Sequence, residues 1–308
     1  MNLMNKNKRY NTLNSYYKFK YGKKVAKISL NASFTCPNKD GKSGYGGCTY
    51  CSKLGSGDFA GDKHKPLKEQ FNDIKEIIEK KWPDSLYIPY LQANSNTYDN
   101  LNNLKKIYEE VITFDPNIVM LSIATRPDCL EDEKIEYLSR LNKKIPVQIE
   151  LGLQTIHEST SLLINRCHSL ECLTNVVKKL RANNIEVVLH IINGLPYETK
   201  EMMLETIRYI NTLDIQGLKI HSLLILKDTK MGNDYLLKPW DILTLEQYTD
   251  IVVDQLRILN PNIIIHRLAA DGPTNDLIAP LWTQKKLVVM NEIDKKMRQL
   301  DAYQGDLI

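Results

Sequence analysis

Acidic residues are absent from the first 39 positions of this 308-residue chain, although its formal net charge is only +4. Tyr10, Tyr16, Tyr17 and Tyr21 are interleaved there with basic residues. The basic residues are Lys6, Lys8, Arg9, Lys18, Lys20, Lys23, Lys24, Lys27 and Lys39. Such a mixture can follow a phosphate backbone and stack unpaired bases. We call residues 1–23 the basic N-terminal arm. The alternative to nucleic-acid contact is that this arm is a solvated, partly disordered surface segment, and both interpretations remain open.

Long apolar runs are also missing. The N-terminal residues have no apolar stretch typical of a signal peptide, and no run approaches the roughly 20 residues of a membrane-spanning helix. We therefore expect no membrane association and a cytoplasmic protein. Hydrophobic residues make up 43% of the chain and charged residues 25%, which is ordinary for a soluble globular protein with one sizeable core.

Cysteine is scarce, and half of it is clustered. Three of the six cysteines form one pattern: Cys36, eleven residues, Cys48, two residues and Cys51. In a reducing compartment such a cluster favours metal binding over disulfides. Pro37 and several glycines allow the intervening loop to fold back. Cys129 and Cys172 are better explained as small core residues.

Three thiolates are one short of a closed zinc site. A [4Fe-4S] cluster held by three cysteines keeps one iron open for a small molecule. The alternative is a zinc site completed by His64 or Cys129.

The sequence around and after these cysteines resembles the radical S-adenosylmethionine (SAM) superfamily. Within it, the chain is most similar to YtqA/YhcC-type proteins, nearest to the YtqA (MnmL) branch. The similarity runs from about Tyr10 to the C-terminus, and its motifs are KLGSGDFAG (53–61), ATRPDCL (124–130), ELGLQT (150–155), HIINGLP (190–196) and HRLAADGP (266–273).

The resemblance implies a [4Fe-4S] cluster on Cys36, Cys48 and Cys51, with SAM on the open iron and cleaved to a 5′-deoxyadenosyl radical. It also implies SAM-binding roles for Tyr50, Asn96, Thr97, Glu150, Gln154, Arg166 and Asn193. Asn96 and Thr97 replace the usual Gly-Gly-Glu segment. Glu150 supports a functional role by itself, because a carboxylate in an apolar strand is costly to bury unpaired. Arg166 could instead belong to a helix end.

Strand and helix patterns alternate along the chain, which predicts parallel βαβ units. The predicted strands are 25–30, 86–91, 118–124, 147–151, 187–192 and 218–224. The predicted helices between and after them are 67–80, 101–114, 131–141, 170–183 and 200–213. Six units fit an α/β fold of the partial (β/α)6 TIM-like type over residues 24–226. Residues 227–308 form a short α/β extension, with helices at 243–259 and 287–300 and a strand at 263–267.

The motifs follow the strands, where barrel active sites lie. By resemblance, the substrate is transfer RNA (tRNA), whose wobble 5-carboxymethylaminomethyl(-2-thio)uridine is converted towards 5-aminomethyl(-2-thio)uridine. The carboxymethyl group requires a cationic partner, for which Arg126, Lys219, His221 and Arg267 are candidates near strand ends. His221 could equally be a core histidine.

Expected partners are a reductant such as flavodoxin or ferredoxin, and a methyltransferase acting on the product. Two other functions stay open. The first is a radical SAM enzyme acting on a small molecule or a protein, and the second is a non-catalytic metal-binding or RNA-binding module.

Overall fold

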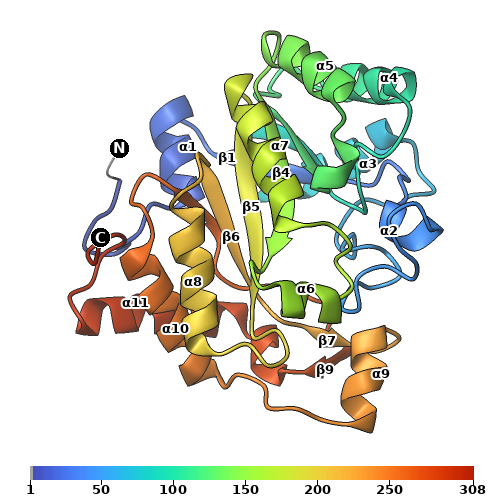
Figure 1. Cartoon of the computed structure of the whole chain (residues 1–308). Helices are drawn as coiled ribbons and strands as arrows, with labels where there is room; N and C mark the ends of the chain where they lie inside the picture. Colours follow the sequence, from blue (N-terminus) through green and yellow to red (C-terminus); the bar gives the residue numbers. More distant parts are fainter. Residues whose placement is uncertain (1–2) are drawn as a thin grey trace.

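The computed structural model describes residues 3–308 and is built on one curled sheet of seven parallel strands (Figure 1). The strand order is β1-β2-β3-β4-β5-β6-β8, so each strand pairs with the next along the sheet. The strands are β1 (Val25–Leu30), β2 (Leu86–Leu91), β3 (Leu121–Thr125), β4 (Val147–Gln154), β5 (Glu186–Asn193), β6 (Gly217–Ser222) and β8 (Ile264–Arg267). The predicted α/β partial barrel is confirmed.

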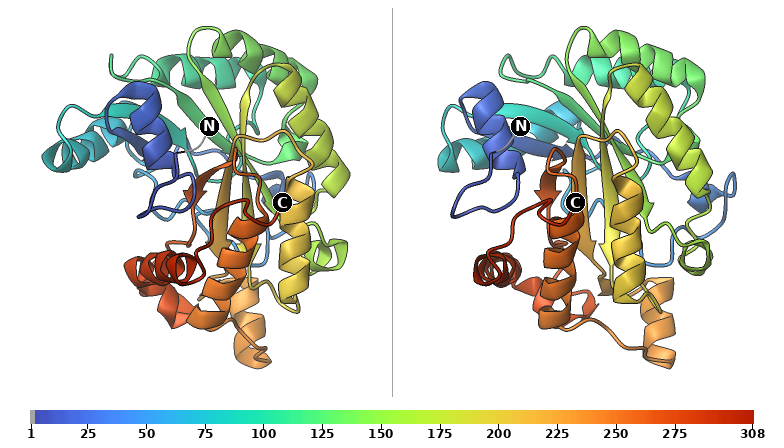
Figure 2. Two further views of the ribbon diagram at one scale, coloured as in Figure 1. Left: turned by 90° about the vertical axis from the view of Figure 1, so that its left-hand side faces the viewer. Right: turned by 60° about the vertical axis from the view of Figure 1, so that its left-hand side comes forward.

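Helices cover the outer face of this sheet (Figures 1 and 2). They are α3 (Leu67–Lys81), α4 (Leu101–Val111), α5 (Asp132–Asn142), α7 (Leu170–Ala182), α8 (Lys200–Ile210), α10 (Leu245–Ile258) and α11 (Lys286–Gln299). In α7, Leu173, Val177 and Leu180 are buried at helical spacing against the sheet. The Ser169 side chain caps its start by accepting from the Cys172 N–H, which satisfies a free helix-end donor.

The C-terminal residues complete the barrel sheet. Strand β8 pairs in parallel with β6, and Gly217 lies opposite Ile264. Short helix α9 (Lys230–Leu237) and the antiparallel pair β7 (Ile225–Leu226) and β9 (Leu277–Ala279) lie at the lower end of the barrel in Figure 1, with α6 (Glu158–Leu163). The 3-10 turns are Pro127–Cys129 and Leu281–Gln284. The predicted extension therefore contributes the seventh strand.

The N-terminal segment is folded, so the expectation of a partly disordered arm is wrong, while contact of the arm with nucleic acid stays a prediction. Helix α1 (Leu13–Tyr21) contacts edge strands β1 and β8, and the Ile265 N–H donates to the Asn11 carbonyl at 2.8 Å. Tyr10 and Tyr17 are buried, so these two rings are not available to stack bases, whereas Tyr16 and Tyr21 are only half-buried. Met1 and Asn2, the first residues of the predicted arm, lie outside the described residues. Helix α1 closes the barrel at the end opposite α6 (Figure 1).

Replacing Tyr17 by alanine tests this closing role. The substitution removes a ring that packs on Val25, Ile88 and Met120, so we expect a loss of about 3–5 kcal/mol of unfolding free energy, as for other buried aromatic residues. Denaturant unfolding measures it. Tyr45→Ala is the matched control, since its ring is 79% exposed and its loss should cost under about 0.5 kcal/mol. Equal effects of the two variants would contradict a structural role for α1.

No helix within residues 3–308 combines the length and apolarity needed to cross a bilayer.

Candidate active site

A cavity of about 810 Å³ runs through the inside of the barrel. Its wall includes residues of the cysteine loop and residues from β1, β2, β4, β5, β6 and β8. Leu13 and Tyr17 of α1 line it as well. Because the carboxyl ends of parallel strands meet at one rim, loops far apart in sequence converge on this space.

The cysteine loop follows β1 and is held in a compact shape by its own backbone. Cys36 precedes the short helix α2 (Pro37–Asp40), which ends at Gly41 with φ of 98°, a conformation suited to glycine. The Gly47 N–H donates to the Asn38 carbonyl at 2.7 Å, and the Cys51 N–H donates to the Cys48 carbonyl at 3.0 Å. The fold thus brings Cys36, Cys48 and Cys51 to one cavity wall.

A second loop, residues 164–168, fastens the cysteine loop to the barrel. Asn165 donates through Nδ2 to the Gly47 carbonyl at 2.8 Å, and Asn38 donates through Nδ2 to the Asn165 carbonyl at 2.6 Å. Asn38 Nδ2 also lies 3.6 Å from Cys48 Sγ. Neither asparagine was predicted as a site residue, because nothing in the sequence pairs residues so far apart.

Cys48 and Cys51 share a hydrogen bond, which together with burial raises the pKa of Cys51 well above its usual range. The hydrogen bond from Cys51 and the charge of Arg126 lower the pKa of Cys48 to about 6, against the effect of burial. Burial raises the pKa of Cys129 to about 12. Because the thiolate is the metal ligand, this donor set fits a cysteine-ligated cluster. Cys172 and Cys129 do not line the cavity.

No three His, Cys, Asp or Glu side chains among residues 3–308 are grouped as a ready metal site. The fold does not support the zinc alternative, since neither of the proposed fourth ligands, His64 and Cys129, lines the cavity.

Arg166 and Gln154 present polar atoms that lack partners within the described chain. Arg166 donates through one terminal nitrogen to the Leu153 and Thr155 carbonyls at 2.6 Å, while its second terminal nitrogen is buried without a partner. Gln154 sits at a strand irregularity with φ of 59°, and its Oε1 is likewise unpaired. Both residues line the cavity, as does Tyr50. Buried polar atoms are normally paired, so these fit a polar ligand such as SAM.

Three other predicted SAM contacts lie elsewhere. Asn96 donates to the Ala124 carbonyl at 2.8 Å, and Thr97 bonds Thr125 Oγ1 at 2.6 Å. Asn193 exchanges hydrogen bonds with Gln255 at 2.7 and 2.9 Å. None of the three lines the main cavity; Gln92, Asn94 and Ser95 line it beside β2 instead. Asn96 and Thr97 therefore fasten their loop to the end of β3, and Asn193 joins the end of β5 to α10.

Glu150 lies at the centre of a buried charge network. Its side chain is fully enclosed, and it pairs with Lys27 of β1, Lys219 of β6 and His190 of β5. Although burial alone would raise the pKa of Glu150, the two lysines hold it well below its usual range. From the sequence, Lys27 was counted only among the basic residues near the N-terminus, although a lysine within the apolar strand VAKISL was a usable signal.

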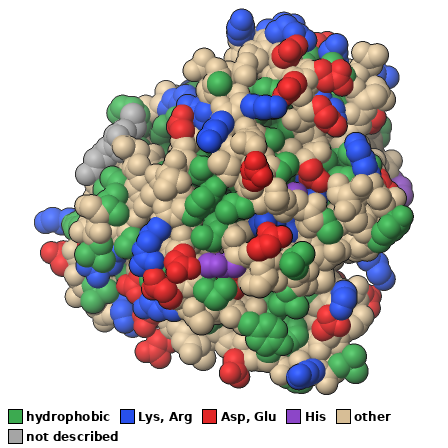
Figure 3. All heavy atoms as spheres, viewed as in Figure 1, with side chains coloured by type: hydrophobic (Ala, Val, Ile, Leu, Met, Phe, Trp, Pro, Cys, Tyr) green, Lys and Arg blue, Asp and Glu red, His purple; other side chains and the backbone are tan. Residues whose placement is uncertain are grey.

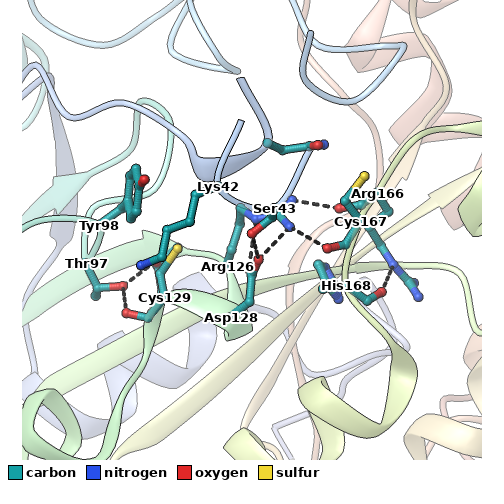
Figure 4. Close-up of polar contacts among 12 residues, drawn as sticks. Lys42, Ser43, Thr97, Tyr98, Arg126, Asp128, Cys129, Arg166, Cys167 and His168 are labelled. Atoms are coloured by element: carbon teal, nitrogen blue, oxygen red, sulfur yellow. Dashed lines mark hydrogen bonds and ion pairs between the residues drawn. The ribbon is translucent and has the colours of Figure 1, made fainter. Parts of the chain in front are cut away.

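The four predicted cationic residues fall into two places. Arg126 is at the rim, where it forms a two-pronged ion pair with Asp128 at 2.9 Å and donates to the Arg166 carbonyl at 2.8 Å (Figure 4). Lys219, His221 and Arg267 line the interior. Arg126 therefore braces the loops around the cysteines, and the other three cluster about Glu150.

Comparisons with known proteins agree with this geometry. Residues 36–210 match the family described as Radical SAM superfamily, and residues 215–299 match the Radical_SAM C-terminal domain. The chain is 46% identical to YtqA of Bacillus subtilis over 98% of its own length and 93% of that protein. It is 32% identical to YhcC of Escherichia coli over 91% and 89%.

Two further matches are more distant. A tRNA uridine(34) acetyltransferase of Methanocaldococcus infernus is 29% identical over 35% of this chain and 19% of that protein. The solved structure of Elp3 from the same species superposes with a TM-score of 0.68 at 16% identity, covering 92% of this chain and 64% of that one. That likeness is one of fold.

The chain belongs to the radical SAM superfamily, in the group that contains YtqA and YhcC, and is an enzyme of the class that uses a [4Fe-4S] cluster and S-adenosylmethionine.

Proposed function

We propose that the protein modifies the wobble uridine of tRNA, converting 5-carboxymethylaminomethyl(-2-thio)uridine towards 5-aminomethyl(-2-thio)uridine. The observation that carries the proposal is the single cavity that joins the cysteine wall to an interior rich in cationic side chains. A substrate with a carboxylate beside the carbon to be attacked suits such a cavity. The more distant relative that acts on tRNA uridine 34 supports the same substrate class.

The cavity suits a base that is turned out of a single-stranded loop. Anticodon bases are unpaired and can enter a pocket, where aromatic rings stack on them. Phe59 lines the cavity and is 57% exposed, so its ring is free to stack at the mouth. On the face seen in Figure 3, basic and acidic side chains are interspersed. RNA binding then depends on the cavity mouth more than on a broad basic surface there.

The chain's own residues have separate tasks in this proposal. Cys36, Cys48 and Cys51 hold the cluster, which with bound SAM supplies a 5′-deoxyadenosyl radical. Arg166 and Gln154 hold SAM through their unpaired buried atoms. Lys219 and Arg267 face the carboxymethyl group of the nucleotide as cations, and His221, whose pKa burial holds well below its usual range, faces it as a neutral hydrogen-bonding group. The enclosing barrel keeps water from the reacting carbon.

Two partners follow from the chemistry. A small one-electron reductant such as flavodoxin or ferredoxin would supply the cluster, and a methyltransferase would take the aminomethyl product. We propose both partners together with the wobble-uridine reaction.

Mass spectrometry of tRNA nucleosides tests the function. We compare a strain lacking the gene with the same strain carrying the intact gene or a Cys48→Ala copy. The deletion and the variant should both accumulate the carboxymethylaminomethyl nucleoside and lose its aminomethyl and methylaminomethyl descendants. Identical profiles in all three strains would exclude this tRNA substrate and favour a small molecule or a protein.

A further inference from the structure

Both carboxylate oxygens of Glu150 are already occupied by protein donors. Oε1 accepts from Lys27 and from Ser122 at 2.9 Å, and Oε2 accepts from Lys219 and from His190 at 2.7 Å. A ribose hydroxyl of SAM would have to displace one of these groups. The arrangement therefore favours a different role for Glu150 from the SAM contact that the sequence suggested.

The two lysines on Glu150 are not equivalent. Lys27 donates to Glu150, to Ser122 Oγ at 3.2 Å and to Gln148 Oε1 at 3.1 Å, which uses all three ammonium hydrogens. Lys219 donates to Glu150 and, at 3.4 Å, to the Tyr90 hydroxyl. Lys219 lines the cavity and retains one N–H for a ligand.

The charges around Lys219 leave a positive excess. Burial lowers the pKa of His190 to about 4 and holds the pKa values of His221 and His266 well below their usual range, so these rings are neutral. The carboxylate of Asp271 lies 3.5 Å from the guanidinium of Arg267, but it also forms an ion pair with the ammonium group of Lys286 at 2.6 Å. Its one negative charge is therefore shared between two cations. The groups that face Lys219 are Lys27 (β1), Tyr90 (β2), Glu150 (β4), His190 (β5), His221 (β6), and His266 and Arg267 (β8).

We infer that Glu150 is a positioning residue that holds the ammonium group of Lys219 towards the cavity, and that Lys219 there binds a carboxylate of the substrate. Glu150 neutralises one of its two lysines, so the site accepts one anionic group and discriminates against substrates that lack it. The identity of the anion rests on the proposed function. The placement of Lys219 does not.

This arrangement makes anion binding depend on pH. Burial lowers the pKa of Lys219 to about 7, and Glu150 opposes that effect. Binding needs the protonated amine, so it is strong below pH 7 and weakens as pH rises through that value. A neighbouring charge moves a pKa by about 1 to 3 pH units, so Glu150→Gln should reduce the protonated fraction at pH 7 about fivefold or more. Lys27→Met removes a repelling charge and should raise the pKa of Lys219.

The first test is a titration that needs no tRNA. In the cluster-loaded protein carrying lysine labelled with carbon-13 at the ε position, NMR follows Lys219, whose signal is assigned by its loss in Lys219→Arg. The midpoint should lie near pH 7, fall in Glu150→Gln and rise in Lys27→Met. A midpoint near 10 in the unmodified protein, or one that neither variant moves, overturns the inference. If Glu150→Gln does not fold, Lys27→Met alone decides it.

The second test measures binding of each ligand. Glu150→Gln should bind SAM with unchanged affinity, and a tenfold weaker SAM affinity would overturn the positioning role. Lys219→Met should raise the KM for the carboxymethylaminomethyl tRNA at least about tenfold, whereas Lys219→Arg should retain binding and lose its pH dependence near 7. If the titration behaves as expected while this tRNA is not turned over, the proposed function fails and the placement of Lys219 stands.

Discussion

Replacing Cys48 by serine should eliminate the iron–sulfur cluster and reduce SAM cleavage to background. Cys48 lines the cavity together with Cys36 and Cys51, and its lowered pKa of about 6 favours the thiolate form that binds iron. With only two thiolates left, the cluster has too few protein ligands to be held. Iron and sulfide content, the visible absorption of the cluster and 5′-deoxyadenosine production measure the effect after anaerobic reconstitution.

Cys172→Ser provides the matched control. Cys172 lies on α7 outside the cavity, and burial raises the pKa of its thiol. This variant should keep the full cluster and normal SAM cleavage. A Cys48→Ser protein that retains its iron would exclude the three-cysteine site, and loss of the cluster in both variants would indicate a general effect on folding.

Replacing Arg166 by methionine should weaken SAM binding by about 10- to 100-fold, the usual cost of losing a charge-assisted hydrogen bond. The side chain is 1% exposed, one of its terminal nitrogens is buried without a partner, and the residue lines the same cavity as the three loop cysteines. Its other nitrogens hold the Leu153, Thr155 and His168 carbonyls, so some loss of stability is also expected. Equilibrium binding of SAM to the cluster-loaded variant gives the affinity.

Arg181→Met separates the two effects. Arg181 also donates to a backbone carbonyl, that of Ile185 at 2.8 Å, and pairs with Asp214 at 2.9 Å, but it does not line the cavity. It should lower stability without changing the affinity for SAM. Equal affinities of the Arg166 and Arg181 variants would remove Arg166 from the SAM site.

The barrel was predictable because its signals are local. Apolar runs such as Leu86–Leu91 and helices with apolar spacing such as Leu67–Lys81 lie where the sequence placed them. Helix α1 was missed because its stability comes from contacts with β1 and β8, at opposite edges of the sheet. Its basic surface resembled a solvated segment, and only the fold shows that Tyr17 is buried.

The residues of the candidate site could be predicted where they lie close together in the sequence. The Cys-x-x-Cys pair and the nearby Cys36 are such residues, and all three line the cavity. The partners of Glu150 come from β1, β5 and β6, so no sequence spacing indicates that Lys27, His190 and Lys219 meet there. Asn96 and Thr97 follow a strand as a ligand-binding segment would, but their side chains are turned into the protein.

The most direct measurement combines the reconstituted protein, SAM, a reductant and tRNA isolated from a strain that lacks the gene. Mass spectrometry then follows 5′-deoxyadenosine and the wobble nucleosides in one reaction. We expect the carboxymethylaminomethyl nucleoside to be lost as the aminomethyl nucleoside appears, with 5′-deoxyadenosine formation that requires this tRNA. Formation of 5′-deoxyadenosine at the same rate without tRNA, with the wobble nucleosides unchanged, would contradict it.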